Sequence, residues 1–138
     1  MSVKIIADST CDLSKELLER YDISVLPLHI VLGDKEYKDG LEISPDEIYQ
    51  WSNKNNAAPK TSAASISDAM EIFNTYMKTY DEIICFSISG QMSTTVNVLR
   101  MAAEELEAED KIHIIDSENL STGGGLLVIE AAIMAADT

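Results

Sequence analysis

Short apolar runs alternate with segments of helical periodicity along most of this chain. The apolar runs cover residues 3–7, 82–88 and 111–115. The helical segments include the one that follows Ser65 and those over residues 93–107 and 125–136. Strands that alternate with helices favour a parallel sheet covered on both faces and joined by right-handed crossovers. We therefore expect an α/β fold with a mostly parallel sheet flanked by helices on both faces.

Capping residues indicate where several helices begin. The order Ser44-Pro45-Asp46-Glu47 supplies a capping hydroxyl, a first-turn proline and an N3 glutamate, which predicts a helix from Pro45. Ser65 begins a second N-cap signature, and the helix after it carries apolar residues on its inward face. Near the N-terminus, Asp12 or Ser14 can cap a first helix.

Two segments between these elements are less regular. Residues 23–32 read as one extended run, in which Pro27 cannot donate to a strand ladder and therefore indicates an edge or a bulge. Gly33-Asp34-Lys35 predicts a hairpin turn into residues 36–38. Residues 53–65 lack apolar periodicity and are predicted to form a loop.

Composition and charge exclude several classes of protein. With 138 residues and 46% apolar side chains, the chain can form one core without disulfide or metal, so we expect a single α/β domain over residues 1–138. A formal charge of -14 opposes binding to nucleic acid and to anionic membrane surfaces. The apolar stretch over residues 126–136 contains Glu130 and is too short to span a membrane, so no direct membrane insertion is expected.

The cysteines and the N-terminus predict a cytoplasmic location. Cys11 and Cys85 are far apart and form no C-x-x-C motif or Cys/His cluster, and no secretory segment precedes the first strand. Cys85 reads as a small buried apolar residue. Cys11, near a helix start, could be somewhat acidified but has no evident base.

Four hydroxyl-rich loops are predicted to meet at one edge of the sheet. They are residues 8–10, 60–65, 87–95 and 116–125. Each leads into a helix N-terminus, where amide groups and the helix dipole favour an anion. Lys60 is the only cation among them, so neutral donors predominate. This pattern suits a singly ionised carboxylate better than a polyphosphate, although each serine alone is also explained as a helix cap.

Other polar residues favour structural roles. Asp8 and Asp116 each end a strand, and hydrogen bonds to loop amides explain them better than a shared divalent ion. His29 and His113 have no neighbouring nucleophile in a recognisable arrangement and read as packed or surface histidines. The G-x-S-x-G, G-x-G-x-x-G and P-loop motifs are missing. We therefore expect no catalytic residue, no metal and no cofactor.

Four motifs, in this order, resemble the signatures of bacterial DegV proteins. They are IIADSTCDL at residues 5–13, KTSAAS at 60–65, SISGQMSTT at 87–95 and DSENLSTGGG at 116–125. The resemblance spans essentially the whole chain. It implies a cytosolic protein that binds a long-chain fatty acid and, in some members, presents the carboxylate to the ATP-binding subunit of a fatty acid kinase.

The resemblance also implies the residues that hold the ligand. Thr61 of the T-S motif and Ser93 correspond to the family's hydroxyls that hydrogen-bond the fatty acid carboxylate, and Ser62 and Thr94 complete the candidate site. Thr94 stands where the family usually has glycine, and Val96 where it has an aromatic residue. Ala64 stands where the family's T-S-x-P-S pattern has proline, which removes a residue that would stiffen the approach to the next helix.

The length predicts the first lobe of a two-lobe DegV protein, because family members carry a second lobe that closes over the acyl chain. The expected function is therefore that of a fatty acid carrier without enzymatic activity, with the helix over residues 125–136 as either a wall for the acyl chain or plain core. Two alternatives remain: a small-metabolite kinase or phosphotransferase component, suggested by fold analogy, and a lobe whose acidic surface docks a basic partner.

Overall fold

The main sheet has four strands, all parallel, in the computed structural model, which describes residues 2–137. The strands are β1 (Val3–Asp8), β2 (Ile23–Leu26), β6 (Glu82–Ser87) and β7 (Ile112–Asp116), in the order β2-β1-β6-β7. The predicted parallel sheet is confirmed. Because all four strands run in one direction, the loops that leave β1, β6 and β7 lie at the same edge.

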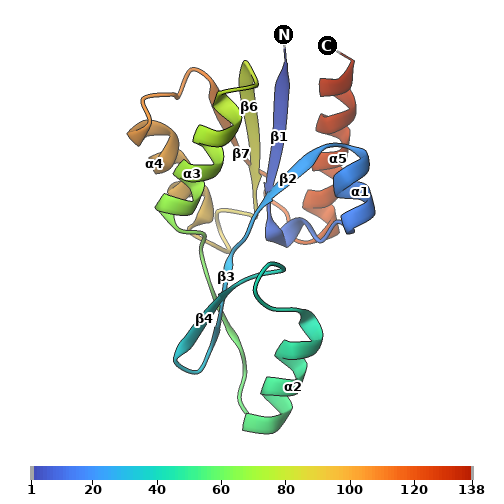
Figure 1. Cartoon of the computed structure of the whole chain (residues 1–138), viewed down its shortest axis with the longest axis vertical. Coiled ribbons are helices and arrows are strands. Elements are labelled where there is room, and N and C mark those ends of the chain that lie inside the picture. Colours follow the sequence, from blue (N-terminus) through green and yellow to red (C-terminus); the bar gives the residue numbers. More distant parts are fainter. Residues whose placement is uncertain (1, 138) are drawn as a thin grey trace.

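Helices cover both faces of this sheet, as Figure 1 shows. On one side lie α3 (Ile66–Met77) and α4 (Thr95–Glu105), and on the other lie α1 (Lys15–Arg20) and α5 (Thr122–Ala136). Successive residues of β1 point to opposite faces, so Ile6 packs with Phe73 and Leu99 while Ile5 packs with Val128. The predicted flanking of the sheet on both faces is therefore confirmed.

A second, antiparallel sheet extends from one end of the main sheet (Figure 1). Its strands are β3 (His29–Leu32), β4 (Lys35–Lys38) and β5 (Lys60–Ser62), in the order β4-β3-β5. The helix α2 (Pro45–Asn55) belongs to the same region, and its Trp51 packs with Ile30 and Leu32. The hairpin turn predicted at Gly33 joins β3 to β4, whereas the pairing of β5 with β3 was not predicted.

Three sequence predictions need correction here. Residues 53–65 are not one loop, because 53–55 belong to α2 and Lys60–Ser62 pairs with β3. The extended run over residues 23–32 is divided between two sheets, and the buried Pro27 lies at the crossing point after the edge strand β2. The helix expected from residue 93 begins at Thr95, because residues 88–94 form the loop that turns the chain after β6.

The predicted caps are present. The capping box joins Ser44 to Glu47, Ser65 Oγ accepts from the Asp68 amide at 3.1 Å, and Ser14 caps α1. At the start of α5 a Cβ atom on residue 125 would lie 2.6 Å from the carbonyl oxygen of Cys11, so the close approach there requires Gly125. Within residues 2–137, no helix is both long and apolar enough to cross a membrane.

Candidate functional site

The buried Asp8 connects two of the loops at the carboxyl edge of the main sheet. Asp8 Oδ2 accepts a hydrogen bond from the Ile88 amide at 2.7 Å, and its Oδ1 accepts from the Thr10 amide at 3.0 Å. Burial raises the pKa of Asp8, although the hydrogen bonds from Thr10 and Ile88 act in the opposite direction. These bonds tie the loop after β1 to the loop after β6.

Asp116 connects the next pair of loops in the same way. Its Oδ1 accepts from the amides of Gly90 at 3.1 Å and Glu118 at 2.9 Å. A Cβ atom on residue 90 would lie 2.6 Å from Asp116 Oδ2, so Gly90 allows the backbone to approach the carboxylate. The predicted structural role of Asp8 and Asp116 is confirmed by these amide contacts.

The carboxyl edge borders a cavity of about 620 Å³ between the two sheets. Its lining includes residues from each of the four hydroxyl-rich loops, among them Thr10, Thr61, Ser62, Ser93, Thr94 and Leu120. Thr61 and Ser93, which are 32 residues apart in the sequence, thus face a common space. All four residues proposed from the sequence line this cavity.

Two of the four hydroxyls have no partner within the described residues. Thr61 is exposed on the edge strand β5, opposite Ile30 of β3, and no hydrogen bond is formed by its side chain within residues 2–137. Thr94 is the exposed N-cap residue of α4, and its side chain makes no capping bond. Both hydroxyl groups can therefore bind a ligand without first breaking a hydrogen bond inside the protein.

The other two hydroxyls are already engaged. Ser62 Oγ donates to Glu36 Oε1 at 3.4 Å, on the opposite face of β5 from Thr61. Ser93 is half-buried and its Oγ accepts the Thr95 amide at 3.1 Å, while the two hydroxyl oxygens of Ser93 and Thr95 lie 2.9 Å apart. The two hydroxyl groups therefore differ. Ser93 can still donate its proton into the cavity, whereas the hydrogen bond of Ser62 points away from the cavity.

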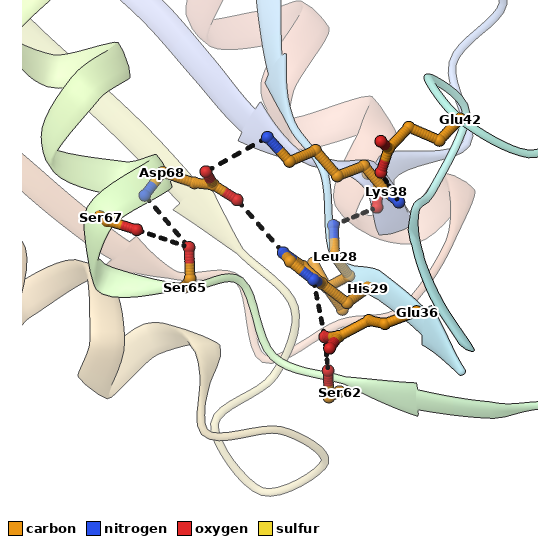
Figure 2. A network of polar contacts seen from close by, with 10 residues as sticks. Leu28, His29, Glu36, Lys38, Glu42, Ser62, Ser65, Ser67 and Asp68 are labelled. Atoms are coloured by element: carbon orange, nitrogen blue, oxygen red, sulfur yellow. Dashed lines mark hydrogen bonds and ion pairs between the residues drawn. The ribbon is translucent and has the colours of Figure 1, made fainter. Parts of the chain in front are cut away.

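A polar network holds the β3–β4 hairpin and β5 against the start of α3, as Figure 2 shows. His29 Nδ1 lies 2.7 Å from Glu36 Oε1, and His29 Nε2 lies 3.2 Å from Asp68 Oδ2. Lys38 Nζ lies 3.3 Å from the second Asp68 oxygen. Burial acts to raise the pKa of Asp68, but the hydrogen bonds from His29, Ser65 and Lys38 outweigh it and lower this pKa.

This network was missed in the sequence. His29, Glu36 and Lys38 lie on adjacent antiparallel strands, while Asp68 comes from the first turn of α3. The prediction that His29 is a packed or surface histidine overlooked its two carboxylate neighbours. Glu36 and Lys38 at alternate positions after the predicted turn, with His29 on the strand before it, were the available signal, but the partner on α3 could not be identified from spacing.

The charge around the cavity favours a ligand with a single negative charge. Among its described lining residues there is no lysine or arginine, and Asp39 is the one ionisable side chain. Repulsion from Asp39 grows with each negative charge on a bound group. Neutral hydroxyl donors can compensate a carboxylate, whereas a polyphosphate normally requires cationic side chains or a metal as well.

The exposure of the two cysteines, of His113 and of α5 tests four further sequence predictions. Cys11 is not acidified, because burial is the main influence on its thiol and raises the pKa. Cys85 is fully buried, as expected, and burial raises its pKa further above the ordinary value. His113 is a surface residue, 3.8 Å from Glu82. On α5, Val128 and Ala132 pack with Phe86 beneath the sheet, which supports the core-packing interpretation for that face.

The comparisons with known proteins agree on one family. The profile described as "Uncharacterised protein, DegV family" matches residues 2–138. A DegV domain-containing protein of Clostridium perfringens is 39% identical over 130 residues, which are 94% of this chain and 46% of the relative. The chain therefore spans about half the length of the relatives it matches.

Solved structures show the same similarity. A fatty acid-binding DegV family protein from Thermus thermophilus has 31% identity and a TM-score of 0.89, over 99% of this chain and 48% of that one. A stearic acid-binding protein from Eubacterium ventriosum has 34% identity and a TM-score of 0.88, with the same coverage. The fold described above is thus the fold of one half of these proteins.

Proposed function

Because the chain belongs to the DegV family, we propose that it binds a long-chain fatty acid through the carboxylate in the cavity between its two sheets. The observation that carries this proposal is the position of Thr61 and Ser93 on the same cavity of about 620 Å³. Relatives with 31% and 34% identity, described as fatty acid-binding and stearic acid-binding, support the ligand class.

The proposed headgroup contacts follow from the hydroxyl geometry. Thr61 on β5 and Ser93 in the loop between β6 and α4 come from different parts of the fold and donate to the carboxylate from different sides. Thr94 is available beside Ser93, while Ser62 contributes to the wall and anchors β5 through Glu36. A hydrogen bond to a charged group contributes about 1.5–3 kcal/mol, so two such bonds orient the headgroup and supply part of the affinity.

The acyl chain supplies the larger part of the binding energy in this proposal. Burial of each methylene contributes about 0.8 kcal/mol, so a long chain needs an extended apolar surface. Since this chain spans about half of its relatives, we assign that surface mainly to a second lobe and propose that residues 1–138 form the first, a single α/β domain. The headgroup site belongs to this half.

We also propose that the protein is a cytoplasmic carrier that lacks catalytic activity. In this role it presents the fatty acid carboxylate to the ATP-binding subunit of a fatty acid kinase, which forms the acyl phosphate. The shortage of cationic groups around the cavity supports this division of labour, because a phosphate donor would have to be held by the partner.

Lipid extraction tests the proposed ligand. The protein is purified without detergent, denatured and analysed by mass spectrometry, with this chain and a two-lobe version prepared side by side. A stoichiometric long-chain fatty acid in the two-lobe protein is expected, with much less in the single lobe. The absence of fatty acid from both, together with no saturable binding of added stearate, would reject the proposal.

Replacement of the headgroup donors tests the proposed site. Ser93→Ala and Thr61→Ala should each lower the affinity for stearate by roughly tenfold to a hundredfold, because each removes a charge-assisted hydrogen bond. Titration calorimetry measures this loss, and thermal unfolding checks that the fold is unchanged. Ser67→Ala, an exposed substitution on α3, is the matched control and should bind as the parent does. Parent-like binding by both cavity variants would show that the site is misplaced.

A further inference from the structure

Thr95 is buried beside the proposed headgroup site and contacts Ser93 twice. Its amide donates to Ser93 Oγ at 3.1 Å, and its Oγ1 lies 2.9 Å from the same oxygen. The residue has 0% exposure, so its side chain cannot reach a ligand or water. Within residues 2–137, Ser93 Oγ is the only hydrogen-bond partner of the Thr95 hydroxyl.

These contacts determine the direction of both hydroxyl protons. A buried hydroxyl that does not donate is left with an unsatisfied proton, at a substantial free-energy cost. Thr95 has only Ser93 Oγ to donate to, so the favoured arrangement has Thr95 as donor and Ser93 as acceptor. A serine oxygen has two acceptor positions, and the amide and hydroxyl of Thr95 then occupy both.

From this arrangement we infer that Thr95 is a positioning residue that turns Ser93 into a donor-only group aimed at the ligand. With both acceptor positions of Ser93 occupied by Thr95, its O–H proton is the one part left for an incoming group. Such a serine binds an acceptor, such as a carboxylate oxygen, and offers nothing to a donor. The inference rests on the proposed function and adds the residue that sets the polarity of its headgroup contact.

Two variants and a second ligand test the role of Thr95. Thr95→Val keeps the side-chain shape but removes the hydroxyl, and it should weaken stearate binding by roughly threefold to tenfold, because Ser93 regains freedom to rotate. Thr95→Ser restores the hydroxyl and should return the affinity to within about twofold of the parent. 1-Octadecanol, which has the same chain and a neutral headgroup, should lose much less affinity than stearate in Thr95→Val, whereas a general loss of structure would weaken both ligands alike.

A double-mutant cycle separates this inference from the proposed function. If Thr95 acts through Ser93, Thr95→Val should cause no further loss in a Ser93→Ala background. Additive losses, or stearate binding by Thr95→Val equal to that of the parent while Ser93→Ala is weakened, would overturn the inference alone. A parent that binds no stearate would overturn both. Should Thr95→Val fail to fold, Thr95→Cys, with its weak S–H donor, takes its place in the same cycle with the same expected outcomes.

Discussion

At the residue scale, Lys4 on β1 is a charged side chain held inside the fold. It is 3% exposed, and its Nζ donates to the Asp22 carbonyl at 2.8 Å and to Asp22 Oδ1 at 3.1 Å. The same Nζ lies 4.5 Å from the centre of the Tyr76 ring. Partial burial acts to raise the pKa of Asp22, but hydrogen bonds from Tyr80 and Lys4 outweigh it and lower this pKa. The ammonium group is therefore fully partnered at the end of the sheet opposite the cavity.

Replacing this lysine should destabilise the fold without affecting the proposed site. Lys4→Met removes two hydrogen bonds and the contact with the Tyr76 ring, and should lower the free energy of unfolding by about 2 kcal/mol. Urea denaturation at pH 7 measures this change. Asp22→Asn retains the carbonyl bond to Lys4 and should cost less. A Lys4→Met protein as stable as its parent would show that apolar packing compensates for the lost partners.

At the element scale, the start of α5 depends on close contact between backbones. Gly124 and Gly125 are neighbours in the first turns of this helix, but their surroundings differ. A Cβ at residue 125 would lie 2.6 Å from the Cys11 carbonyl oxygen and 3.0 Å from Leu13, whereas at residue 124 the nearest atom is Ser117 Oγ at 3.6 Å. Steric room therefore distinguishes two glycines that look equivalent in the sequence.

The two glycines form a matched pair of variants. Gly125→Ala should lower the free energy of unfolding by about 1–3 kcal/mol, because the added methyl group forces α5 away from the loop after β1. Gly124→Ala should leave stability unchanged or raise it by up to about 1 kcal/mol, since alanine is the better helix former. Thermal and urea unfolding measure both changes. Equal effects of the two variants would contradict the close contact at Gly125.

At the scale of the whole molecule, the polar network in Figure 2 links the two sheets. Asp68 lies in the first turn of α3, which packs on the main sheet, while His29, Glu36 and Lys38 belong to the second sheet. Residue Ser62 of β5 is attached to the same network through Glu36. Since Thr61 lies on β5 and Ser93 precedes α4, this network helps to determine how the two proposed headgroup donors face each other.

The network should contribute stability that is lost on acidification. The pKa of Asp68 is lower in the folded state than its ordinary value of 3.8, so its contribution is complete above that value and falls as the pH drops below it. Asp68→Asn should therefore be less stable than the parent at pH 7, by roughly 1–3 kcal/mol, and the difference should shrink toward pH 2.5.

Urea unfolding of both proteins at several pH values checks this expectation. Asp8, whose pKa is raised, acts with the opposite sign. The fold favours its neutral form, so the contribution of Asp8 to stability increases as the pH falls. Asp8 is present in both proteins, so its effect cancels in the difference. Ser67→Asn, another exchange on the first turn of α3, controls for general effects of substitution. A difference that is constant across pH would contradict the role assigned to the Asp68 carboxylate.

Local patterns were enough to predict much of the fold. The alternation of apolar runs with helical segments predicts the parallel sheet and its two helical layers, because the spacing of apolar residues in each element follows its buried face. The capping residues Ser44 and Ser65 predict two helix starts, since a cap acts within one turn. The four hydroxyl-rich loops were also visible, and the strand directions alone bring three of them to one edge.

The remaining features depend on contacts between distant parts of the chain. The strand β5 is only three residues long and forms because β3 lies beside it, so local propensity could not reveal it. Burial raises the pKa of Cys11, and only the packed structure shows that burial. The partners of His29, and the cavity shared by Thr61 and Ser93, likewise exist only after folding. Sequence determines which groups are available, whereas long-range packing decides which of them meet, because a hydrogen bond or an apolar contact acts over a few ångströms.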